Sequence, residues 1–210
     1  ARSFEELFQG TKKVNWSKLI PKNGKMHVIG KSVKSTLYSV PDCQSIVKKA
    51  IITSMSEAYG ITEFKEDGPV YKIEVAILKD KVTLTIDTSG SGLHKRGYRE
   101  NSGAAPLKET LAAAMILQSR WQDSYELIDP FCGSGTILIE AAMIAQNIAP
   151  GLNREFVCET WPTMPMYIFN GVRDGARKSI KNKDIKLVGY DIDIWVLRTA
   201  ENNAVKAGVS

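Results

Sequence analysis

The run from Asp129 to Thr136 reads Asp-Pro-Phe-Cys-Gly-Ser-Gly-Thr, and its residue types and spacing could hold a small ligand. It follows an apolar stretch that begins at Tyr125, and a helical apolar pattern begins at Ile137. This order predicts a strand, a tight glycine turn and a helix. Gly133 and Gly135 lack a Cβ, so the backbone can approach a ligand there, and the free N–H groups of the helix can face it. We therefore expect a cofactor site at the carboxyl end of a parallel strand.

The residues around the two glycines disfavour a phosphate-bearing ligand. A Walker loop requires lysine directly after its second glycine, where this chain has Thr136, and a dinucleotide fingerprint requires a third glycine, where it has Leu138. Asp191 ends the next predicted strand, and a carboxylate there can accept both ribose hydroxyl protons. A ribose that is held without phosphate contacts fits S-adenosylmethionine best. A plain strand-to-helix turn capped by Asp129 is the alternative that the loop alone leaves open.

The residues before this run predict a separate domain, over residues 1–90, of small α+β type. Glycine and serine break the pattern at residues 88–92, which sets the boundary. The expected elements are a helix from a capping box at Ser3–Glu6, a strand over Lys25–Val33, a helix through Cys43–Ala58 that ends at Tyr59–Gly60, and a hairpin of Val70–Leu78 and Lys81–Asp87 turning at Lys79–Asp80.

Residues 91–210 predict part of an α/β domain with a parallel sheet, in which strands alternate with helices. The expected elements are a helix opened by Pro106, a strand over Tyr125–Asp129, a helix to Ile148, an irregular stretch from Leu152 to Asn170, a basic helix over Arg173–Lys183, a strand over Lys186–Asp191 and a helix over Ile194–Ala207.

Composition narrows the class of protein. The chain is 43% hydrophobic and 24% charged, and no apolar run reaches the length of a membrane span, so we expect a cytoplasmic protein without a membrane partner. Three cysteines and two histidines, without metal-ligand spacing, argue against a disulfide framework or a metal site. The net charge is +5, and most of the excess lies in the first 87 residues, which fits a nucleic-acid partner.

A basic cluster from His94 to Arg99 opens the second domain. Its cations surround an aromatic ring, a combination suited to phosphates and a stacked base. A solvated linker, with its arginines paired to nearby acids, is an equally good interpretation. The candidate RNA contacts are Lys95, Arg96, Tyr98 and Arg99 in this cluster, with Lys31 and Lys34 in the first domain.

Several motifs together resemble those of the THUMP-domain class I RNA methyltransferases, and in particular the 23S rRNA guanine-N2 methyltransferase family, formerly labelled N6-adenine-specific DNA methylases. The resemblance covers most of the chain from Asp87 onward and is less specific before that residue. It is carried by Leu93–Arg99, Ala105–Thr110, Asp129–Ala141, Gly189–Asp193, the spacing Asn203-x-x-x-Ala207-Gly208 and, in the first domain, Lys31–Ser35 and Gln44–Ala50.

The resemblance implies a THUMP-like RNA-binding domain, incomplete at its N-terminus, followed by the N-terminal part of a Rossmann-like methyltransferase domain. It implies S-adenosylmethionine as cofactor and N-methylation of an RNA base, with guanine N2 in 23S rRNA favoured. A DNA adenine-N6 methylase and a non-catalytic RNA-binding module are the alternatives. By resemblance, the cofactor would be held by Pro106, Asp129, Pro130, Cys132, Gly133, Ser134, Gly135 and Asp191.

One motif of this family is missing from the chain. No Asn-Pro-Pro-Tyr/Phe run, which positions the reacting amine in the family, occurs in these 210 residues, and only two strands of the expected parallel sheet are present. We therefore expect a piece of a longer protein, with no catalytic residue in this chain.

Overall fold

A computed structural model describes residues 1–99 and 107–209. The chain divides into two compact units. Unit 1 comprises Ala1–Gly90 and Val157–Pro165, and unit 2 comprises Ser91–Phe156 and Met166–Ser210. The first stretch of unit 1 ends at Gly90. The segment Val157–Pro165 differs from expectation, since its sequence position suggested the second domain.

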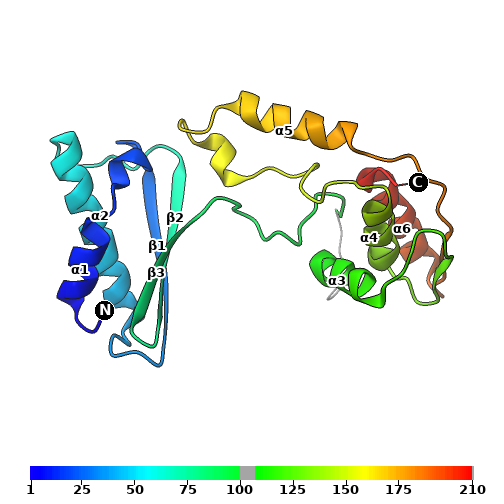
Figure 1. The fold of residues 1–210 in the computed structure, drawn as a ribbon, viewed down its shortest axis with the longest axis horizontal. Coiled ribbons are helices and arrows are strands. Elements are labelled where there is room, and N and C mark those ends of the chain that lie inside the picture. Colours follow the sequence, from blue (N-terminus) through cyan, green and yellow to red (C-terminus); the bar gives the residue numbers. More distant parts are fainter. Residues whose placement is uncertain (100–106, 210) are drawn as a thin grey trace. The chain divides into compact units, whose positions relative to one another are not determined.

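Unit 1 is a three-stranded sheet with two α-helices packed beside it (Figure 1). β1 pairs in parallel with β2, and β2 pairs antiparallel with β3. The elements are α1 (Phe4–Lys12), a 3-10 turn (Trp16–Lys18), β1 (Lys25–Val33), α2 (Val40–Tyr59), β2 (Val70–Leu78), β3 (Lys81–Asp87) and a second 3-10 turn (Val157–Thr160).

The side chains of β2 alternate between the two faces of the sheet, and one of these faces packs on the core. Tyr71, Ile73, Val75 and Ile77 are buried, while the residues between them are half-buried, as a strand with one face on the core requires. Lys79 and Asp80 both have positive φ, the backbone that a two-residue hairpin turn needs. The strand pair predicted from the sequence is confirmed, in its bounds and in its inward face.

The short segment from Val157 to Pro165 closes one edge of the unit 1 core. Trp161 is 7% exposed and its ring stacks on Tyr71, with 4.5 Å between centroids. Its Nε1–H donates to the Val70 carbonyl at 3.1 Å, and the Cys158 amide donates to the Thr88 carbonyl. These contacts hold residues 157–165 against β2 and the end of β3, which lie far earlier in the sequence.

Replacing Trp161 with phenylalanine should destabilise unit 1 by about 1–2 kcal/mol, because the Val70 carbonyl loses its donor while the ring contact with Tyr71 remains. Hydrogen exchange of the β2 amides would measure this local free energy. Trp121→Phe is the matched control, since the Trp121 indole donates to the Tyr125 carbonyl at an exposed position. If the β2 amides were equally protected in both variants, the hydrogen bond from Trp161 to Val70 would not stabilise β2.

The described residues of unit 2 form a two-stranded parallel sheet, β4 with β5, and four α-helices (Figure 1). α3 and α6 both pack against α4, with a core that includes Tyr98, Ile139 and Met143. The elements are α3 (Glu109–Ser119), β4 (Leu127–Asp129), α4 (Thr136–Ala145), α5 (Met166–Lys178), β5 (Leu187–Gly189) and α6 (Ile194–Ala207).

Two expectations about residues 152–183 are wrong. The stretch expected to be irregular contains a 3-10 turn and the start of α5, which begins at Met166 directly after Pro165 and ends at Lys178, so the helix expected over Arg173–Lys183 is shifted. Proline is common at the start of a helix, because its missing N–H has no intrahelical partner there. Helix α6 spans the predicted residues, and Asp193 caps it through the Trp195 amide.

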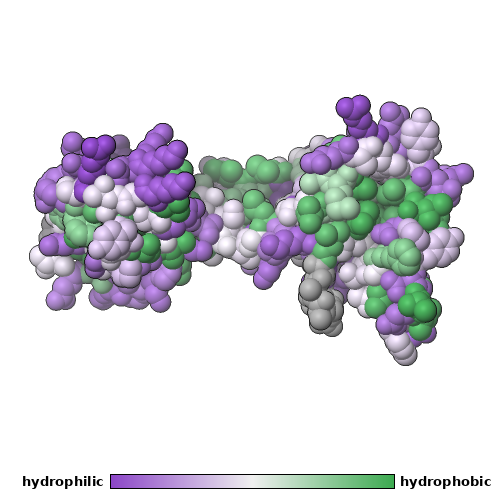
Figure 2. Space-filling view, turned by 90° about the horizontal axis from the view of Figure 1, so that it is seen from below, coloured by the Kyte–Doolittle hydropathy of each residue, from purple (hydrophilic) through white to green (hydrophobic). Residues whose placement is uncertain are grey.

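Figure 2 shows green, hydrophobic patches on the surface. Many large apolar side chains are exposed on unit 2. They include Leu117 on α3, Tyr167 and Val172 on α5, and Val205 on α6. Within the described ranges, no helix combines the length and apolar character that a membrane crossing requires.

Candidate functional site

The glycine loop joins the ends of the two parallel strands. The Tyr190 amide donates to the Asp129 carbonyl, and the Cys132 amide donates to the Tyr190 carbonyl, each at 2.9 Å. The Gly133 amide donates to Oδ2 of Asp191 at 3.0 Å. The structure therefore brings the predicted loop and the predicted acidic residue into direct contact, at the carboxyl ends of β4 and β5.

The carboxylate of Asp191 is held in one orientation. Its Oδ2 accepts from Gly133, and its Oδ1 accepts from the Asp193 amide at 3.0 Å. Each carboxylate oxygen can accept a further hydrogen bond, so a pair of ribose hydroxyls is a suitable additional partner. Asp129 is oriented in a similar way, because its Oδ1 accepts from the Phe131 amide.

The two glycines of the loop have different roles. Gly133 has a φ of +54°, and a Cβ built there would meet no heavy atom within 4 Å, so the backbone borders open space. Gly135 has a φ of +80°, and a Cβ there would lie 3.0 Å from the Cβ of Ala200 on α6. The first glycine leaves room for a ligand, and the second allows α6 to approach the start of α4.

Cys132 faces the protein interior. It is buried, and its Sγ would lie 2.9 Å from a Cβ added to Gly189. Burial, followed by the charges of Asp129 and Asp191, raises the pKa of the Cys132 thiol. The thiol is therefore neutral near pH 7, which does not suit a nucleophile.

A buried asparagine with no role predicted from the sequence also supports the loop. Asn203 lies on α6, and its side-chain amide donates to the Ser134 carbonyl at 3.1 Å. A polar residue on the inward face of a predicted helix is the signal that could have indicated it, since buried polar groups need partners.

Exposed apolar side chains border the loop on both sides of Asp191. Phe131 is 86% exposed, and Tyr190 and Ile192 are exposed as well. Flat or branched apolar groups beside a ribose-binding acid suit the faces of a purine ring. Pro130 is also exposed at the start of the loop, and Pro106, the remaining predicted cofactor contact, lies outside the described residues.

A cavity close to the loop is separate from this site. It has a volume of about 550 Å³ and lies between α4, β5 and α6, where its lining runs from Cys132 and Gly135 to Gln146 and Asp184. Neither Asp129 nor Asp191 lines it. It extends along the helices away from the strand ends, whereas doubly wound sheets bind ligands beyond the strand ends.

The basic cluster does not present its aromatic ring to solvent. Tyr98 is 1% exposed, and its hydroxyl donates to Glu140 on α4. The guanidinium of Arg96 pairs with Glu140, and that of Arg99 pairs with Glu109. This corrects the expected RNA contacts at Tyr98, Arg96 and Arg99, because acids from α3 and α4 draw the cluster into the unit 2 interior.

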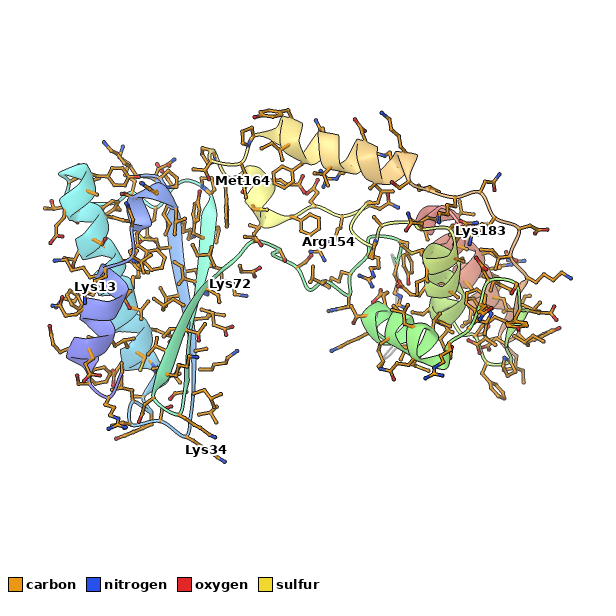
Figure 3. All side chains as sticks on the ribbon, in the orientation of Figure 1. Lys13, Lys34, Lys72, Arg154, Met164 and Lys183 are labelled. Atoms are coloured by element: carbon orange, nitrogen blue, oxygen red, sulfur yellow. The ribbon has the colours of Figure 1, made fainter. Side chains whose placement is uncertain are left out.

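Three lysines remain as candidate phosphate contacts. Lys95 is exposed, and Lys34 projects from the turn after β1 (Figure 3). Lys31 lies on β1 and pairs with Glu74 at 2.6 Å, although its side chain is 65% exposed. Among residues 1–99 and 107–209, no group of three histidine, cysteine or carboxylate side chains could hold a metal ion.

Comparison with known families identifies both units. The profile described as "RMKL-like, methyltransferase domain" matches residues 96–210. The chain belongs to this methyltransferase family. A THUMP-domain profile matches residues 1–87, so the predicted order of domains, a THUMP domain followed by a class I methyltransferase domain, is confirmed.

Relatives within the family carry names that refer to RNA. The chain is 50% identical over 212 residues to the Bacillus subtilis protein named "Putative RNA methyltransferase YpsC", of which it covers 55%. It is 46% identical over 149 residues to the ribosomal RNA large subunit methyltransferase K/L of Vibrio campbellii, and this match covers 69% of the chain and 21% of that protein.

Solved structures of methylases have the same fold. A Listeria monocytogenes protein described as a predicted N6-adenine-specific DNA methylase matches the whole chain with a TM-score of 0.96 at 52% identity. SMU.472, described as a putative methyltransferase complexed with SAH, matches 99% of the chain with a TM-score of 0.91 at 42% identity. The chain covers 56% of each of these two structures.

Proposed function

We propose that the protein containing this chain is an S-adenosylmethionine-dependent RNA methyltransferase, and that the glycine loop with Asp191 binds the cofactor. The hydrogen bond from the Gly133 amide to Asp191 carries the proposal, because it joins the loop and the acid at the end of two parallel strands. The related structure of SMU.472 is a complex with SAH, the demethylated form of this cofactor.

Different residues around the loop would bind different parts of the cofactor. Asp191 would hold the ribose, and exposed Phe131, Tyr190 and Ile192 would flank the adenine. The N-terminus of α4 and the backbone at Gly133 would receive the methionine part, whose carboxylate favours a helix N-terminus. When bound, the cofactor supplies an activated methyl group, and the protein contributes chiefly orientation of the reacting partners.

The substrate we favour is an exocyclic amine of an RNA base, with guanine N2 of 23S rRNA first. The THUMP domain, the RNA-related names of the relatives and the lysines at positions 31, 34 and 95 support RNA. A base in a duplex would have to leave its stack to reach the loop. A DNA adenine-N6 methylase is the second candidate, because the Listeria protein is described as a predicted N6-adenine-specific DNA methylase.

Two measurements on the full protein test this function. Titration calorimetry should show binding of S-adenosylmethionine, and absence of binding would refute the proposal. Transfer of a labelled methyl group should then occur to 23S rRNA fragments and not to duplex DNA. The reverse preference would favour the second candidate, and the modified nucleoside would identify the base.

A further inference from the structure

The N-terminal half of α4 is held by a buried polar network that lies behind the glycine loop. All its members belong to unit 2, and it contains two guanidinium groups and two carboxylates, so its formal charges balance. Each side chain is about nine-tenths buried or more. The members of this network are Arg96, Tyr98, Arg99, Glu109, Thr136 and Glu140.

One half of the network is centred on Glu140. The Nε and Nη2 atoms of Arg96 each lie 3.4 Å from one of its carboxylate oxygens, and the Tyr98 hydroxyl donates to Oε1 at 3.2 Å. Glu140 lies one turn into α4, so these contacts fix that turn against the segment that opens unit 2.

The other half is centred on Arg99. Its Nη2 donates to the hydroxyl oxygen of Thr136, and both terminal nitrogens donate to the Leu107 carbonyl at 3.2 and 3.3 Å. Its Nη1 lies 3.6 Å from the carboxylate of Glu109 on α3. Arg99 thus joins the first residue of α4, the segment before α3, and α3 itself.

This network is poorly suited to stabilising the fold alone. The Nε of Arg99 and the Oε2 of Glu109 are buried, and neither has a hydrogen-bond partner among the described residues. Burial raises the pKa of Glu140 even though Arg96 lies beside it and opposes the shift. Buried ion pairs often add little stability relative to apolar packing, so a further role of this network is to be sought in the site that it adjoins.

The position of Thr136 points to this role. It follows Gly135 directly and is the first residue of the helix whose N-terminus faces the loop. A shift of α4 along its axis would move the N–H groups that receive the cofactor, and displacements of about 1 Å at such sites reduce rates by about 100-fold. A rigid anchor on Thr136 would prevent this shift.

We propose that Arg99 is a positioning residue that, through Thr136, sets the N-terminus of α4 for the methionine part of S-adenosylmethionine without touching the cofactor. This inference rests on the proposed function. It predicts that weakening the anchor impairs recognition of the methionine part and leaves recognition of the adenosine part intact, since Asp191 and its neighbours would hold that part from the loop between β5 and α6.

The test removes only the hydroxyl that Arg99 contacts. In the full protein, Thr136→Val should lower the affinity for S-adenosylmethionine about tenfold, as the loss of one charge-assisted hydrogen bond would. The affinity for adenosine, which lacks the methionine part, should be unchanged. Thr136→Ser keeps the hydroxyl and should bind both ligands as the unaltered protein does. Thr199→Val on α6, where the hydroxyl donates to the Trp195 carbonyl, controls for the type of substitution.

The outcomes separate the possibilities. If Thr136→Val binds S-adenosylmethionine as tightly as the unaltered protein, the positioning role is wrong. If it loses both ligands equally, the network supports the fold in general and the inference is also wrong. Arg99→Lys, which keeps the charge but not the fork of donors, should reproduce the selective loss. If the unaltered protein does not bind S-adenosylmethionine, it is the proposed function that fails.

Discussion

Asp191→Ala should reduce the affinity for S-adenosylmethionine by about 100-fold or more, measured by titration calorimetry on the full protein. The substitution removes the acceptor for the ribose hydroxyls, and two hydrogen bonds to a charged group contribute about 3 kcal/mol or more together. It also leaves the Gly133 amide without its acceptor, so the loop loses the contact that fixes it to the end of β5. Both effects act on the ligand-binding surface.

Asp193→Ala provides a matched control two residues away. It removes a carboxylate of the same charge, but this carboxylate caps α6 through the Trp195 amide and does not contact the loop. We expect a loss of about 1 kcal/mol in helix stability and almost no change in cofactor affinity. Equal losses of affinity in the two variants would contradict the ribose role of Asp191. The affinity of Asp191→Asn for S-adenosylmethionine should lie between those of Asp191→Ala and the unaltered protein, since its amide oxygen can still accept one hydrogen bond.

Glu140→Ala should destabilise unit 2 by about 3–5 kcal/mol, the largest stability effect that we expect in this chain. The substitution leaves the buried guanidinium of Arg96 without a carboxylate and the Tyr98 hydroxyl without its acceptor. Hydrogen exchange of the α4 amides would report this local loss, which a single unfolding transition of a two-unit protein need not resolve.

A surface ion pair in the same unit is the control for Glu140. Asp174→Ala removes the partner of Arg177 on α5, where both side chains are more than half exposed, and it should change stability by less than about 0.5 kcal/mol. A similarly small effect for Glu140→Ala would show that Arg96 and Tyr98 find other partners.

The contribution of Glu140 to the stability of unit 2 should depend on pH, because its carboxyl group titrates. Burial raises its pKa in the folded protein, so its contribution to stability is full below the unfolded value of about 4.3 and declines as the pH rises through the folded value. The unfolding free energy of the unaltered protein, minus that of Glu140→Gln, should therefore fall as the pH rises from about 4. A rise of this quantity over the same range would contradict the direction of the shift.

Local patterns predicted the elements that carry the cofactor loop. The Asp-Pro-Phe-Cys-Gly-Ser-Gly-Thr run could be placed between a strand and a helix, because glycine spacing and apolar periodicity are properties of neighbouring residues. The same holds for the hairpin of β2 and β3, where alternation and a two-residue turn coincide. Asp191 was predictable as well, because it closely follows β5, the strand that pairs with β4.

Other residues were misjudged because their environment comes from distant parts of the chain. Tyr98 and its arginines resemble an RNA-binding surface in sequence, but Glu109 and Glu140 pair with the arginines in the interior. Trp161 returns to stack on Tyr71, which lies far earlier in the chain. No periodicity within a segment can reveal a partner on another element.

The sequence by itself thus determined the two domain types, the glycine loop and the acid beside it, since each depends on residue identity and short-range spacing. The tertiary structure alone decided which charged groups are buried together. In the folded protein the Asn203 side chain donates a hydrogen bond to the Ser134 carbonyl. The arginines of the basic cluster pair with buried carboxylates and become part of the network that holds α4. The physical reason is that buried polar groups must find partners, and which partners are within reach depends on how helices from separate parts of the chain pack.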